Sequence, residues 1–235
     1  MAIGRTTRWS EAISGGGPWT TTGSFTLTSG HLHTIAVTLQ HFGGGGLPTG
    51  FTFDKGVWDP ITHIDDVPDQ HSIWKYRGIG NGDSGVLTIT AVGGSLFKMV
   101  NISCEDWTGT DVGGTNGSAG IVQSNAVVSA SANPQDITIP LSALTDPVNN
   151  AVYFAQSAGA ASTPDGAYTE IVDQAGTDYF LETGWLLPGD TAPGATSGTA
   201  FQPQVGIAIE IKAAGAGAPP SPVVSRSRRF LGWTA

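Results

Sequence analysis

The chain has 235 residues, of which 39% are hydrophobic and 12% are charged, and its formal net charge at pH 7 is −9. The apolar content is sufficient for a core of ordinary size, whereas the acidic surface disfavours binding to phosphate backbones or anionic lipid. The single cysteine, Cys104, excludes an internal disulfide and is expected to be buried. We therefore expect a folded protein with no nucleic-acid partner, no membrane partner and no cofactor.

The first residues lack the apolar run of a signal peptide, and no stretch of the sequence has the length of a membrane span. We therefore expect synthesis in a cytoplasm. Any role outside the cell would then require lysis or release within an assembly.

Residues 1–30 are expected to form an extended arm that leads into an edge strand over 20–28. Phe25 and Leu27 alternate with Ser and Thr there. Trp9 and Trp19 lie around a glycine-rich stretch of this arm, and we expect them to bind a partner.

The clearest early strand is 33–42, where alternate residues from Ile35 to Leu39 share one apolar face. In the segment 72–92, two β-prone runs flank four glycines with Asn81 and Asp83, which predicts a β-hairpin. The other strands are expected at 51–53, 57–58, 95–104, 121–122, 126–128, 137–141, 150–156, 168–172, 179–187 and 205–211.

These short apolar runs, separated by turn residues, predict an all-β protein with an antiparallel jelly-roll-like β-sandwich. We expect an N-terminal arm and edge strand at 1–30, the sandwich at 31–212, and a linker with a C-terminal tail at 213–235. Residues 105–120 are expected to be a long loop. No internal repeat at a fixed period is visible.

An acidic segment, 59–71, is expected to be a loop. Together with Asp54 it offers oxygen and nitrogen donors that a cation such as Ca²⁺ accepts, namely Asp59, His63, Asp65, Asp66, Asp69 and His71. The spacing fits neither an EF-hand nor a zinc site. We expect a solvated loop and no metal, with a bound cation as the alternative.

The composition changes after Lys212, where a Gly/Ala/Pro linker leads into a basic and aromatic tail. Its expected partner-binding residues are Arg226, Arg228, Arg229, Phe230, Leu231 and Trp233. Aromatic anchors with arginines at the rim are typical of docking segments. The alternative is a disordered terminus.

Catalytic motifs are not evident: there is no Gly-x-Ser-x-Gly elbow, no His-Glu-x-x-His and no phosphate loop. Glu105 and Asp106 beside Trp107 would suit a glycosidase only if they faced a cleft. Trp107 is also the candidate for stacking on a sugar ring, because Trp74 and Trp185 lie within strand patterns. We therefore expect that the protein is not an enzyme.

One resemblance covers most of the chain. It rests on the Thr-rich strand 35–39, the Trp74-Lys75-Tyr76 strand with its glycine loop, and the closing strand 206–211. The pattern also includes Gly50-Phe51-Thr52, Val86–Thr90, Glu105-Asp106-Trp107, Pro140 and Val152–Ala155. This pattern resembles β-sandwich proteins of tailed-bacteriophage virions.

The resemblance implies a jelly-roll-like structural module on a capsid or tail. We expect a non-enzymatic virion protein, a capsid decoration or head-fibre protein anchored to other virion proteins through its termini, and itself oligomeric. The alternative is a glycan-binding, host-adhesion module of a tail or baseplate.

Overall fold

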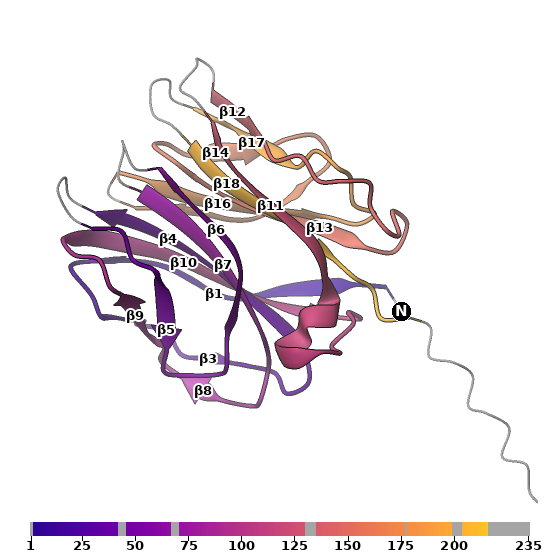
Figure 1. The fold of residues 1–235 in the computed structure, drawn as a ribbon, viewed down its shortest axis with the longest axis horizontal. Helices are drawn as coiled ribbons and strands as arrows, with labels where there is room; N and C mark the ends of the chain where they lie inside the picture. Colours follow the sequence, from indigo (N-terminus) through magenta and orange to yellow (C-terminus); the bar gives the residue numbers. More distant parts are fainter. Residues whose placement is uncertain are drawn as a thin grey trace, which may run out of the picture.

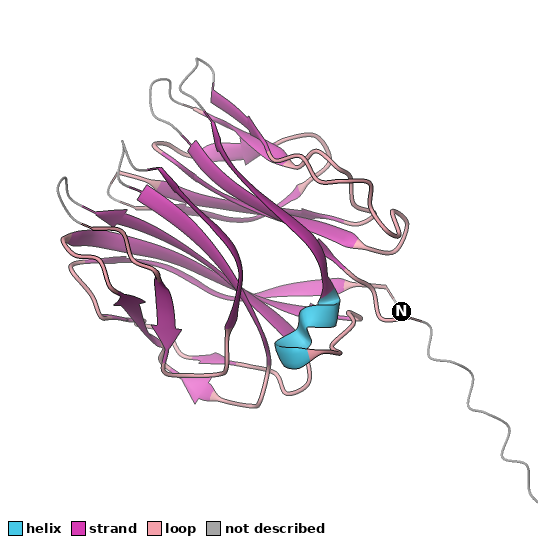
Figure 2. Ribbon diagram, viewed as in Figure 1, coloured by secondary structure: helices cyan, strands magenta, loops and turns pink. Residues whose placement is uncertain are grey.

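The computed structural model describes residues 2–41, 46–66, 71–129, 135–176, 178–198 and 204–215. Their regular secondary structure consists of antiparallel strands, apart from one short 3₁₀ helix, η1 (Thr115–Gly120), and loops connect the strands (Figure 2). The expected all-β, sandwich-like fold is confirmed. Within the described ranges no helix is long and apolar enough to cross a membrane.

The strands fall into two halves of the chain. Those of the first half are β1 (Gly4–Ser14), β2 (Trp19–Thr20), β3 (Phe25–Thr26), β4 (Leu32–His41), β5 (Gly50–Phe53), β6 (Asp59–Asp66), β7 (His71–Ile79), β8 (Ser84–Gly85), β9 (Thr88–Val92) and β10 (Phe97–Thr108). Those of the second half are β11 (Ile121–Ser129), β12 (Gln135–Thr138), β13 (Ala151–Ala158), β14 (Ser162–Pro164), β15 (Thr169–Ala175), β16 (Phe180–Leu186), β17 (Gly194–Ser197) and β18 (Gln204–Ile211).

Each half is a jelly roll made of one five-stranded and one three-stranded sheet. In the first half the sheet orders are β1-β10-β4-β7-β6 and β2-β9-β5, with a small extra pair, β3-β8. In the second half they are β11-β18-β13-β16-β15 and β12-β17-β14. With β3 and β8 set aside, the strands correspond one to one in chain order. The expected single sandwich over 31–212 is therefore two jelly rolls of equal topology.

The two five-stranded sheets stack face to face, and the three-stranded sheets cover their outer faces (Figure 1). At the edges, β1 lies next to β15, and β6 lies next to β11. Because β1 corresponds to β11 and β6 to β15, these two contacts are equivalent. The halves are thus related by an approximate two-fold axis near the central strands β4 and β13.

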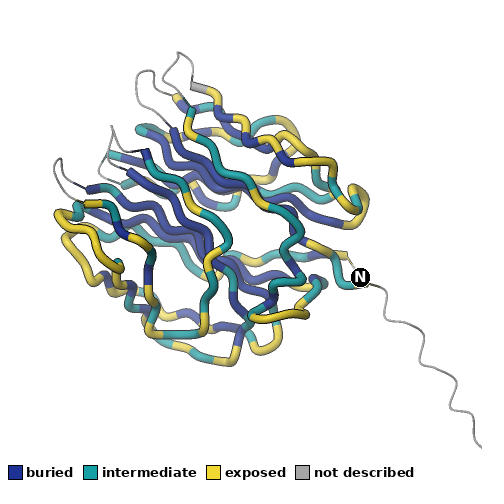
Figure 3. The backbone as a smooth tube through the Cα atoms, in the orientation of Figure 1, coloured by how far each residue is buried: buried dark blue, intermediate teal, exposed yellow. Residues whose placement is uncertain are grey.

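Three apolar clusters fill the spaces between these layers. Figure 3 shows that the buried residues are concentrated in the central strands of the two large sheets. The middle cluster lies between the two large sheets, and the outer clusters lie inside each jelly roll. Strands such as β4 and β18 are therefore buried on both faces, as expected of strands covered on two sides. In β18, Ile207 and Ile209 contribute to the middle cluster, whereas Ala208 belongs to the outer cluster.

Several sequence expectations need correction. The N-terminal segment is not an arm, because β1 pairs along β10 as the edge strand of a large sheet. The segment 72–92 is not a hairpin: β7 pairs with β4 and β6, whereas β9 pairs with β2 and β5 in another layer. The acidic segment is largely strand β6, and residues 57–58 lie outside strands.

Candidate functional site

A buried ion pair lies between the two large sheets. Lys75 Nζ on β7 is 2.9 Å from Glu105 Oε2 on β10, and both side chains are completely buried. The carboxylate also accepts hydrogen bonds from Thr34 Oγ1, at 2.9 Å, and from Ser103. From the second half, the Tyr153 ring lies 3.6 Å from the Lys75 ammonium. Burial lowers the pKa of Lys75, and the Glu105 carboxylate opposes that shift. This network is enclosed and joins the two halves.

Trp107, the expected sugar-stacking residue, belongs to the same interface. It lies in β10, not in a loop, and its side chain is 0% exposed. Its indole N–H donates to Thr34 Oγ1 at 2.9 Å, and its ring meets Tyr153 and Trp185 edge-on. The expectation of an exposed Trp107 is wrong, so this side chain is not accessible for stacking on a sugar ring.

The side chains of the two N-terminal tryptophans also pack against the apolar core. Trp19 is 2% exposed, packs against Phe51 and Phe97, and donates its N–H to Gly15 O. Trp9 is half-buried against the first outer cluster and donates to Glu11. Neither residue is presented as a free anchor. The tail residues Arg226, Arg228, Arg229, Phe230, Leu231 and Trp233 lie outside the described residues.

Asp106, the other carboxylate expected near Trp107, faces the inside of the first jelly roll. Arg8 Nε donates to Asp106 Oδ2 at 2.9 Å, and His31 Nδ1 lies 2.7 Å from Oδ1. Burial alone would raise the pKa of Asp106, but hydrogen bonds from Arg8, Thr28 and His31 hold it below its usual value. Glu105 and Asp106 therefore point to opposite faces of β10 and form no catalytic pair across a cleft.

The second jelly roll holds a matching carboxylate, Glu210. It accepts hydrogen bonds from Gln123 at 2.7 Å, Thr145 at 2.9 Å and Asn150 at 2.6 Å. These bonds outweigh burial and keep the pKa of Glu210 low. We call Asp106 and Glu210, each with its three donors, the carboxylate clasps.

The clasps occupy equivalent positions. Asp106 pairs with the second residue of β4, and Glu210 with the second residue of β13. His31 and Asn150 each directly precede that strand. Each clasp thus ties the loop before a central strand to the last strand of its jelly roll, and its role is structural.

The acidic segment expected to offer cation ligands contributes to a buried cluster. His71, 1% exposed, stacks on Tyr179 of the second half at 4.3 Å, and its Nδ1 is 3.9 Å from Asp66 Oδ2. Burial, together with the nearby His41, lowers the pKa of His71 to about 4. Among the described residues, no group of three or more His, Cys, Asp or Glu is arranged to hold a metal ion.

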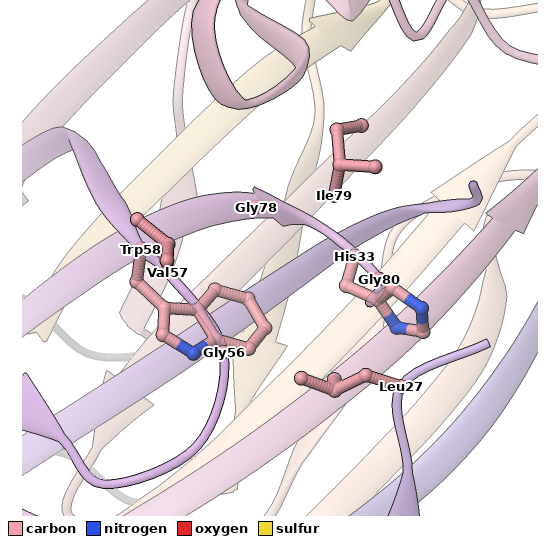
Figure 4. A pocket seen from close by; sticks show the side chains of 8 residues that line it. All are labelled: Leu27, His33, Gly56, Val57, Trp58, Gly78, Ile79 and Gly80. Carbon is pink, nitrogen blue, oxygen red and sulfur yellow. The ribbon is translucent and has the colours of Figure 1, made fainter. Parts of the chain in front are cut away.

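A narrow crevice beside Trp58 is a packing seam (Figure 4). It has an empty volume of ≈ 130 Å³ but no space for a water-sized sphere. A Cβ on Gly78 would lie 2.5 Å from Val57 O, and one on Gly80 would lie 2.0 Å from Thr28 O. Close backbone approach therefore explains these glycines, which the sequence pattern suggested were turn residues.

The two ends of the described chain meet at one end of the sheet stack. Ala214 N donates to Gly109 O at 2.8 Å, and a Cβ on Gly109 would lie 2.3 Å from Ala2 O. A hollow of ≈ 300 Å³ lies beside them, lined in part by His31, Val112 and Ala214. No sequence signal pointed to this meeting, because it depends on the pairing of β1 and β18 with distant strands.

The comparisons with known proteins give no relative: no family model, no curated protein and no solved structure matches the chain.

Proposed function

We propose that this chain is a non-enzymatic structural protein of a tailed-phage virion, a capsid decoration or head-fibre protein held on the particle by its terminal segments. In this proposal it is made in the host cytoplasm and joins other virion proteins during assembly. The resemblance in strand pattern motivates the assignment.

The meeting of both chain ends at one end of the stack supports the proposal most directly. A body anchored by its termini needs both of them on the side that faces the particle. Here residues 2–3 and 213–215 flank Gly109 at that side. The opposite end of the stack, where β4, β6 and β15 finish, would then face outward.

Co-purification with intact particles tests the proposal. The full-length chain, a 1–212 truncation and a full-length variant with Arg226, Arg228 and Arg229 changed to Gln are each produced with particles, and retention is measured by mass spectrometry. We expect the full-length chain to be retained and the other two to be lost. Equal retention of the truncated chain, or no retention of the full-length chain, would overturn anchoring by the tail.

A further inference from the structure

The two halves meet through polar contacts at the end of the stack opposite Gly109. Lys98 lies at the start of β10, whereas Gly109 follows its end. Here the link between β15 and β16 packs on the ends of β4, β7 and β10. Gln40 Nε2 donates to Asp178 Oδ2 at 3.1 Å, and Lys98 forms an ion pair with the same carboxylate. We call the whole group the latch: Asp178 and Tyr179 of this link, with Gln40, His71, Lys98 and Asn101, the first-half residues that contact them.

Tyr179 makes the other two contacts of the latch. Asn101 Nδ2 on β10 donates to the backbone oxygen of Tyr179 at 3.0 Å. The Tyr179 ring stacks on the His71 imidazole of β7, with 4.3 Å between the ring centroids and 20° between the ring planes. Tyr179 is 6% exposed and His71 is 1% exposed. The closed latch therefore shields this imidazole from water.

The imidazole of His71 is enclosed without a hydrogen bond. Neither of its ring nitrogens has a hydrogen-bond partner among the described residues. Asp66 Oδ2 lies 3.9 Å from Nδ1, which is beyond hydrogen-bonding distance. Burial of a polar group without a hydrogen bond is unfavourable, and burial of a charge without a close partner is far more so. The closed latch therefore favours the neutral imidazole over the imidazolium.

Titratable and charged residues approach this imidazole from both halves. In the described part of the chain they are His41 on β4, Asp65 and Asp66 on β6, Lys98 on β10, and Asp178 and Tyr179 from the second half. A carboxylate at the distance of Asp66 favours the imidazolium. Burial first, and then His41, nevertheless lower the pKa of His71 from 6.5 to about 4. His71 is therefore neutral in the closed latch at neutral pH.

We propose that the latch is an acid-sensitive switch that opens when His71 takes up a proton. In the open state the imidazolium is in contact with water, and Asp178 and Tyr179 are separated from β4, β7 and β10. The halves stay joined, because the middle apolar cluster includes Trp107, which lies at the other end of β10. The opening is thus local, and the rest of the fold is retained.

The linkage between protonation and opening gives the direction and the pH range of the effect. His71 binds a proton with a pKa of about 4 in the closed latch and with its ordinary value of 6.5 once it is exposed. The closed state is therefore fully favoured above pH 6.5 and loses this advantage as the pH falls towards 4. At pH 5 the open fraction should be about 25-fold larger than at pH 7.5.

Thiol labelling measures the opening. Met99 is 2% exposed, and a Cβ on Gly176 would lie 2.3 Å from its Cε. Met99→Cys therefore places a thiol beneath the link, where only the open latch exposes it. The reagent is dithiodipyridine, which also reacts in acid, and each rate is divided by that of a free thiol at the same pH. We expect the corrected rate to rise about 25-fold between pH 7.5 and pH 5.

Two further variants isolate the imidazole. His71→Phe keeps a ring on Tyr179 but takes up no proton, so its corrected rate should rise less than about threefold. His63→Phe is the matched control, because His63 is a more exposed imidazole of the adjoining strand that stacks on Trp74. This variant should keep the full rise. An equal rise with His71→Phe, a constant rate or a slower rate in acid would overturn the switch. Labelling of the buried Cys104 in parallel would show general unfolding and would overturn a local latch.

Hydrogen exchange of the unmodified chain is a second measurement that needs no variant of Met99. The rates are corrected for the pH dependence of intrinsic exchange. We expect peptides that contain Tyr179 to exchange faster at pH 5 than at pH 7.5, whereas peptides around Ile207 of β18 stay protected. Faster exchange of both regions, or of neither, would overturn the proposal. Both experiments use purified protein, so their outcome is independent of the virion assignment.

Discussion

At the scale of single residues, the Lys75–Glu105 pair is the most consequential group. Both side chains are fully buried between the two halves, and the partners of the carboxylate come from β4, β7, β10 and β13. A buried ion pair adds little stability relative to a well-packed apolar pair, but loss of one partner leaves an uncompensated charge.

We expect Lys75→Met to lower the free energy of unfolding by about 3–5 kcal/mol, because Glu105 is left buried without its cation. The double variant Lys75→Met, Glu105→Gln should recover more than half of that loss. Lys55→Met, at a partly exposed pair with Asp54, is the matched control and should change stability by less than about 1 kcal/mol. Urea denaturation measures all three, and a double variant no better than the single would contradict the argument.

At the scale of elements, local patterns identified strands well but not their partners. Period-two alternation in 33–42 and 205–211 predicted β4 and β18 closely. The prediction of a hairpin at 72–92 is wrong because jelly-roll strands pair with segments that are distant in the sequence. A glycine-rich link between two strands has the same sequence pattern whether the strands pair with each other or lie in different sheets. Segment 105–120 was expected to be a loop, yet Glu105, Asp106 and Trp107 are buried in β10, where polar partners on both faces satisfy them.

The equal topology of the two halves was not visible in the sequence. The two carboxylate clasps occupy equivalent positions, but only a short signature is shared: Leu27-Thr28 and Leu144-Thr145 each precede a central strand. Different donors, His31 and Asn150, occupy the same position before that strand. The two halves share a strand topology but differ in side-chain chemistry at equivalent positions, so a search for a fixed sequence period finds nothing.

The clasps yield a prediction at this scale. Asp106→Asn and Glu210→Gln should each lower the free energy of unfolding by about 1–3 kcal/mol, since each leaves buried donors poorly satisfied. Both carboxylates have lowered pKa values in the folded protein. The stability that their ionised forms contribute is therefore fully present above their pKa values in the unfolded chain, which are near 4, and is lost as the pH falls from there through the lower folded-state pKa values. In denaturation experiments, the free energy of unfolding of each variant should differ less from that of the wild-type chain at pH 3 than at pH 7. Asp136→Asn is the control, and an equal effect at both pH values would contradict the role of the ionised clasp.

At the scale of the whole molecule, the middle apolar cluster makes the two jelly rolls interdependent. Trp107, Tyr153 and Ile209 belong to a single cluster that draws on both large sheets. A separated half would expose this face, and exposed apolar faces of that kind promote association or unfolding.

We therefore expect one cooperative unfolding transition for the full chain, with tryptophan fluorescence and far-ultraviolet circular dichroism giving the same midpoint. Ile209→Asp, which places a charge in the middle cluster, should destabilise both halves together, as read by hydrogen exchange of β4 and β18. Ile171→Asp, at the partly buried margin of that cluster, is the control and should have a smaller effect. Two separate transitions would show that the halves are independent.

The approximate two-fold stacking has a consequence for how the molecule meets its surroundings. A symmetric pair of identical subunits must present the same charges on both sides and has no dipole moment across its axis. Two halves joined in one chain escape that restriction. Here residues 1–108 contain six Lys or Arg and nine Asp or Glu residues, whereas residues 109–211 contain ten Asp or Glu residues and no Lys or Arg. The negative charge of the two stacked halves is therefore concentrated in the second one, and the field of a charged partner surface would favour one orientation of the stack before contact.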